Sequence, residues 1–176
     1  MNEIIKKNGI KFGVIAGVIA VLITAGIYII DLKLFTAWWL GIISILIYII
    51  LGIILMVQTK KELNNIYSFK DAFTTYFVYA IIGIAISVTF NIILFNVIDP
   101  GAKETVKELS IEAAVNMMKK FNTPTTVIKE AVEKMEEQDQ FETFQQLKGS
   151  IFSIIFSAIF GVILAAIFKS KPSYQE

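Results

Sequence analysis

The sequence predicts an all-α membrane protein in which four transmembrane helices carry an amphipathic helical hairpin, inserted between spans three and four. Four long apolar runs support this prediction, and none contains a charged residue although charged residues make up 18% of the chain. The runs are residues 12–30, 34–57, 72–98 and 150–168. Each is close to or above the roughly 20 residues that a helical crossing needs, and none shows the alternation of barrel strands. A mean hydropathy of +0.69 agrees with a single integral membrane domain over residues 1–176.

The first run follows Lys6, Lys7 and Lys11, an arrangement that also occurs at the start of a signal peptide. The run is longer than the usual apolar core of such a peptide, and residues 29–32 offer no small-x-small cleavage site. We therefore expect a retained first span. The short turn at residues 31–33 then makes the first two spans a tight helical pair.

Small residues recur at four-residue spacing within three of the predicted spans. Those of interest are Gly13 and Gly17 in span one, Ser87 with Asn91 one turn further on in span three, and Ser153, Ser157 and Gly161 in span four. Lipid tails do not drive apolar helices together, so close backbone approach along small faces supplies the attraction. We expect Asn91 to face the bundle and bond to a neighbouring helix, because an unbonded amide is costly in hydrocarbon. Helix packing is the favoured role for this set, and lining of a solute path is the alternative.

Residues 99–149 are expected to form a folded helical hairpin. A Pro-Gly pair breaks the chain where the third run ends, and the apolar periodicity predicts a helix over about 102–121. Asn122–Thr123–Pro124 gives a stop and a new start, which predicts a second helix over about 124–139. A hairpin of this size buries little by itself. Its apolar faces must therefore pack on its own bundle, on the bilayer surface or on a partner.

The lysines predict the orientation of the chain. Four spans place both termini on one side, together with the lysine-bearing loop 58–71, whereas the turn at 31–33 on the other side holds one Lys. Short loops rich in Lys are retained in the cytoplasm. We therefore expect both termini in the cytoplasm and residues 99–149 outside it.

Composition removes several kinds of chemistry. The chain has no Cys and no His, which excludes disulfides, thiol nucleophiles and His-dependent catalysis or metal binding. An acidic stretch at 133–142 lacks the ligand spacing of a calcium loop and is interpreted as a solvated helix face. The net charge of +1 gives no overall field for nucleic acid. No catalytic, cofactor-binding or metal-binding residue is predicted. The runs also lack the charged residue that ion-coupled transport normally needs.

The layout as a whole resembles a known family. Ser68–Phe69–Lys70–Asp71–Ala72–Phe73 opens the third span and Ile98–Asp99–Pro100 closes it, before an acidic amphipathic segment and a final span. This arrangement is similar to the uncharacterised bacterial integral membrane family called domain of unknown function 4199, over about Lys11 to Phe168. The resemblance implies a bacterial cytoplasmic (inner) membrane protein of the same architecture. It implies no activity and no site residues.

These observations favour a structural or accessory membrane component. We expect it to act by helix and loop contacts with membrane lipids, with another membrane protein or with further copies of itself. The alternative is an oligomeric small-solute or lipid transporter or pore, with Asn91 and the Ser153–Ser157 face along its path. An enzyme is not expected.

Overall fold

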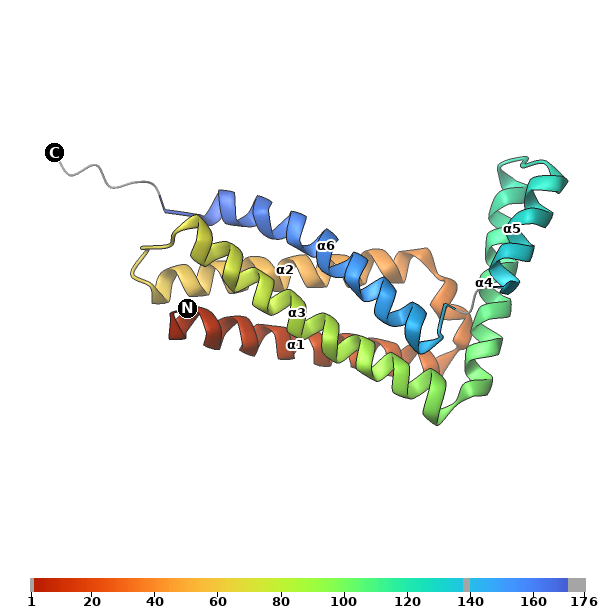
Figure 1. Ribbon diagram of the computed structural model, residues 1–176, viewed down its shortest axis with the longest axis horizontal. Helices are drawn as coiled ribbons and strands as arrows, with labels where there is room; N and C mark the ends of the chain where they lie inside the picture. Colours follow the sequence, from red (N-terminus) through yellow and green to blue (C-terminus); the bar gives the residue numbers. More distant parts are fainter. Residues whose placement is uncertain (1, 138–139, 171–176) are drawn as a thin grey trace.

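The computed structural model describes residues 2–137 and 140–170, and this part of the chain is helical throughout apart from short connections. Its α-helices are α1 (Glu3–Ile30), α2 (Trp38–Glu62), α3 (Phe69–Ile93), α4 (Pro100–Lys120), α5 (Thr125–Glu137) and α6 (Thr143–Phe168). Four helices are long and apolar enough to cross a membrane: α1, α2, α6, and α3 together with the π-helical turn Leu94–Ile98 (η2) that extends it. They lie side by side (Figure 1). The predicted all-α fold with four spans is confirmed.

The first turn of α1 and the last turn of α6 lie at the same end of the bundle, which we call the termini end. The α4–α5 hairpin stands crosswise to the long helices at the other end, which we call the hairpin end (Figure 1). This arrangement agrees with an even number of crossings. Which end faces the cytoplasm stays a prediction.

The start of the second span differs from that expected. The second span does not begin at residue 34, because Leu32–Thr36 forms a 3-10 turn (η1) and α2 starts only at Trp38. Asp31 caps this turn by accepting a hydrogen bond from the Lys33 N–H at 2.9 Å. Hydropathy misplaced the boundary because Leu34 and Phe35, which belong to the turn, are apolar.

The two hairpin helices lie close to their expected positions. The predicted helices 102–121 and 124–139 correspond to α4 and α5, and residues 138–139 lie outside the described part. Asn122 links them with a φ of 55°, the left-handed conformation that stops a helix and that Asn tolerates better than most residues.

The most extensive helix contact among the described residues joins α1 to α3. A β-carbon added at Gly9, Gly13 or Gly17 would lie within 3.0 Å of a side chain of α3, at Val78, Ile82 and Ile86 in turn. Carbon atoms normally meet at about 3.5–4.0 Å. The glycines therefore allow the two backbones to approach more closely than any other residue would.

Packing is dense at the termini end and loose towards the middle. No residue of α1 after Gly17, of α2 before Gly52, of α3 after Gly83 or of α6 before Ser157 is buried. The main core, which includes Tyr76, therefore fills the termini half of the bundle.

A second, smaller core lies at the hairpin end and contains no residue of α2 or α6 among the described residues. Phe95 in η2 is fully buried and contacts the rings of Phe35 and Phe141, with centroids 5.5 and 4.5 Å away. The first half of α4 packs here through the buried residues Ala102 and Val106. Part of the hairpin thus lies on its own bundle, whereas its distal turn leaves Met117, Phe121 and Val127 exposed.

Candidate functional site: a groove in the middle of the bundle

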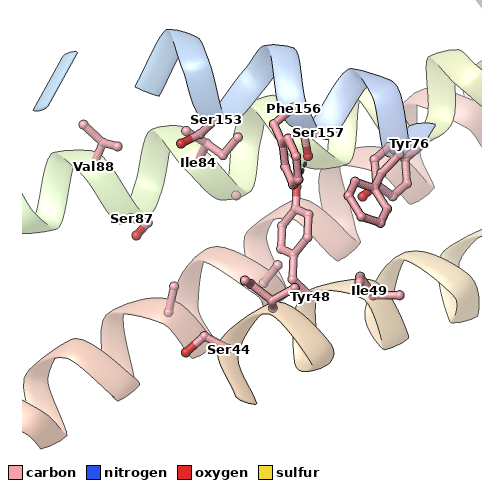
Figure 2. Close-up of a pocket in the computed structure, with 15 residues that line it drawn as sticks. Ser44, Tyr48, Ile49, Tyr76, Ile84, Ser87, Val88, Ser153, Phe156 and Ser157 are labelled. Carbon is pink, nitrogen blue, oxygen red and sulfur yellow. Dashed lines mark hydrogen bonds between the residues drawn. The ribbon is translucent and has the colours of Figure 1, made fainter. Parts of the chain in front are cut away.

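A groove lies where the main core ends, between α2 and the other three long helices. Its cavity has a volume of about 360 Å³. All four spans line it, with Ala16 and Ala20 from α1, Ser44, Ile45, Tyr48 and Ile49 from α2, Tyr76, Gly83, Ile84, Ser87 and Val88 from α3, and Ser153, Phe156, Ser157 and Phe160 from α6. A hollow of about 200 Å³ between α1 and α2 shares Ser44, Tyr48 and Ser87 with it. We call the larger space, of about 360 Å³, the mid-bundle groove (Figure 2).

The groove exists because only the half of α2 nearer the termini end is packed tightly against the other helices. Towards the termini end, Leu55 and Met56 are fully buried in the main core. Asn8 of α1, only 1% exposed, donates from Nδ2 to the Thr59 hydroxyl at 3.2 Å and to a Glu62 carboxylate oxygen at 2.9 Å. Towards the hairpin end, α2 has no buried residue: it lines the groove on one side and exposes Ile42, Leu46 and Ile50 on the other.

Three tyrosines close the groove towards the termini end. The ring of Tyr76 fills the space between α2 and α6: a β-carbon at Gly52 would lie 2.7 Å from it, and one at Gly161 would lie 2.9 Å from it. The Tyr79 ring packs on those of Tyr48 and Tyr76, with centroids 4.7 and 5.4 Å away. The Tyr79 hydroxyl also donates to the backbone carbonyl of Tyr48 at 2.7 Å. We call Tyr48, Tyr76 and Tyr79 the tyrosine layer.

Most hydroxyl groups along the groove already have protein partners. The Ser44 hydroxyl donates to the Leu40 carbonyl at 2.8 Å and that of Ser153 to the Gly149 carbonyl at 3.2 Å, each one turn back on its own helix. The hydroxyls of Tyr48 and Ser157 lie 3.3 Å apart, and Figure 2 shows Tyr48 reaching across from α2 to meet Ser157 on α6. A hydroxyl whose donor is already used makes little demand for a polar ligand. The groove is therefore suited to an apolar molecule.

The residues singled out from the sequence fall into separate places. Ser87, Ser153 and Ser157 line the groove, and Gly161 lies behind Tyr76. Gly13 and Gly17 lie instead in the α1–α3 contact.

Asn91 lies one turn beyond the groove and does not line it. The expectation that it bonds to a neighbouring helix was wrong, since its Nδ2 donates to the Ser87 carbonyl of its own helix at 2.8 Å. The carbonyl four residues back is within reach of an Asn side chain, so the amide is satisfied locally.

Sequence reasoning missed the tyrosine layer and the two glycines that hold Tyr76. A signal was available in α2, where Tyr48 precedes Gly52 by one turn, a large and a small residue on one face. It also missed Asn8, whose position ahead of the first apolar run gave no sign that the helix begins at Glu3.

Comparison with known proteins places the whole of this architecture in one family. The family model described as "Protein of unknown function (DUF4199)" matches residues 11–170. The chain belongs to this family. The match includes every residue that lines the groove, and the resemblance seen in the sequence is confirmed. None of the curated proteins and none of the solved structures matches this DUF4199 chain.

Proposed function

We propose that this DUF4199 protein is an accessory component of the bacterial cytoplasmic membrane that binds an apolar, bilayer-dissolved molecule in the mid-bundle groove. One observation carries the proposal: a cavity of about 360 Å³ lies midway along the four apolar helices, beside the half of α2 that has no buried residue. Cavities of about 300–1,000 Å³ with mainly apolar walls are the usual size for small-molecule binding. The molecules that reach such an opening are those of the bilayer.

The same geometry argues against a solute pore within a single chain. The tyrosine layer and the main core fill the termini half of the bundle, and the groove hydroxyls are largely used inside the protein. A path for a polar solute needs groups that replace its hydration shell. Contacts rather than conduction are therefore the favoured mode of action.

The orientation is part of the proposal. Lys60 and Lys61 lie in the last turn of α2 at the termini end, as do Lys6 and Lys7 in the first turns of α1. By the charge rule this end faces the cytoplasm. The exposed tip around Phe121 then lies on the opposite side, where we propose that it contacts a neighbouring membrane component.

Native mass spectrometry of the full chain, released gently from its own membrane, tests the proposal. We expect wild-type protein to retain a bound apolar species. Ser87→Phe places a ring in the groove and should lose this species, whereas Thr89→Phe, on an exposed position of the same helix, should keep it. A wild-type protein that carries no bound species, or equal retention by both variants, would refute the proposal.

A further inference from the structure

We infer that the occupant of the mid-bundle groove is one acyl chain of a membrane lipid from the leaflet at the hairpin end. This inference rests on the proposed function and names its ligand class. It follows from the length, volume, lining and direction of the groove.

The length of the groove matches one leaflet. Its residues on α3 run from Tyr76 to Val88, which is roughly 18 Å of helix at about 1.5 Å per residue. The hydrocarbon part of one leaflet is about 15 Å thick, half of a core of about 30 Å. A chain that enters from one leaflet therefore extends along much of the groove without needing to bend back.

The volume agrees with a single chain. A water molecule takes up about 30 Å³ of liquid and a methylene group is of similar size, so about 360 Å³ holds roughly a dozen methylene groups. That is the inner part of one acyl chain, whose remaining carbons lie outside the groove. A rigid, bulky ring system would instead meet Tyr48, which reaches across the groove to α6.

The lining favours a hydrocarbon chain over a polar guest. Ile45, Ile84 and Phe156 supply apolar walls, and the hydroxyls of Ser44 and Ser153 donate to carbonyls of their own helices. A methylene chain needs no hydrogen-bond partner. In the groove, such a chain also makes van der Waals contacts with apolar side chains that would otherwise face a gap in the packing.

The direction of entry follows from which end of the groove is closed. Tyr76, held between Gly52 and Gly161, blocks the α2–α6 gap towards the termini end. Towards the hairpin end, no residue of α2 before Gly52 is buried, so the gap stays open along that half of the helix. The lipid headgroup then lies level with Trp38, which is 73% exposed at the start of α2, as indole rings at a membrane interface usually are.

The test uses full-length protein in lipid nanodiscs with two synthetic phosphatidylcholines. One carries a diazirine near the terminal methyl of an acyl chain, and the other carries it near the ester carbonyl. After irradiation, labelled residues are mapped by mass spectrometry. We expect the terminal probe to label Tyr48 and Ser157, at the closed end of the groove. The carbonyl probe should label the first turns of α2, near Leu40.

Filling the groove should abolish the deep labelling. For Ser87→Phe we expect labelling of Tyr48 to fall about tenfold, equivalent to about 1.4 kcal/mol, and for Thr89→Phe to remain as in wild type. Ser153→Phe, with Ile155→Phe on α6 as its control outside the groove, repeats the comparison from a second helix in case one variant fails to fold. Circular dichroism and size-exclusion profiles identify folded variants.

Three outcomes would overturn the inference. One is labelling confined to outward-facing residues such as Ile42 and Ile159. A second is equal labelling at all depths by both probes. The third is a zero-length crosslink from the groove to a second copy of the chain. If mass spectrometry still finds another apolar species in the wild type, only the acyl-chain inference fails; if it finds none, the proposed function fails with it.

Discussion

Replacing Gly13 by Ala tests how closely α1 and α3 depend on each other. The added β-carbon would lie 2.8 Å from Cβ of Ile82 and 2.9 Å from the backbone carbonyl oxygen of Tyr79. Neither atom can swing aside, because both are fixed to the α3 backbone. Since carbon atoms prefer separations of about 3.5–4.0 Å, α1 must move away by about 1 Å at this point.

The magnitude follows from comparison with a glycine in open space. Overpacking of this kind costs about 1–3 kcal/mol. At Gly26, also in α1, an added β-carbon would meet no atom within 4 Å, and Gly→Ala inside a helix gains about 0.5–1 kcal/mol of stability. Because both variants share this gain, we expect Gly13→Ala to be less stable than Gly26→Ala by the overpacking cost, about 1–3 kcal/mol.

The assay is reversible unfolding of both variants and wild type in mixed micelles, followed by circular dichroism as the share of denaturing detergent rises. An independent readout is crosslinking between cysteines introduced into α1 and α3, which is simple because the chain has no native Cys. If Gly13→Ala proved as stable as Gly26→Ala, the close α1–α3 approach described here would be wrong.

Three further outcomes can be checked. Asn8→Ala should lower the unfolding free energy by about 1–3 kcal/mol, because the fully buried Thr59 hydroxyl loses its amide partner; the same micelle titration measures it. Asn91→Leu should change stability by less than about 1 kcal/mol, since its amide bonds within its own helix, and a larger loss would indicate a contact between helices. The N–H of Ala102 and the hydroxyl of Tyr28 hold the pKa of the Asp99 carboxyl below its usual value. The resulting contribution to stability is present at neutral pH and is lost as pH falls through this lowered pKa. The protection of amides in the first turn of α4 against hydrogen exchange, relative to their intrinsic rates, should therefore fall only in acid, and Asp99→Ala should remove that pH dependence.

The spans were predictable because hydropathy and length decide them almost alone. The glycine spacing on α1 also indicated a close helix contact. It did not identify α3 as the partner, because a span that is apolar on every side gives no sign of which face meets which helix. In a soluble protein, the polar face of an amphipathic helix supplies that information.

The groove was hidden for the same reason. Ile84, which lines it, and Ile81, which is exposed to the surroundings, are indistinguishable in a run without charged residues. Ser87, Ser153 and Ser157 were noticed as small polar residues, but their spacing fits tight packing as well as a cavity wall. What decides between the two is Tyr76, whose size keeps α2 and α6 apart at one level, and its contacts with Gly52 and Gly161 exist only in the folded bundle.

The position of α2 links the groove to the hairpin. One half of α2 is fixed by the main core, whereas the other half is attached at its end through η1, whose Phe35 ring meets Phe95. The first half of α4 packs on both η1 and η2. We expect a molecule that enters the groove and displaces the half of α2 nearer the hairpin end to shift η1 against α4, so that occupancy and hairpin position bias each other in both directions. Spin labels at Ile42 and Met117, both exposed, would report this coupling as a distance that differs between wild type and Ser87→Phe and stays unchanged in Thr89→Phe.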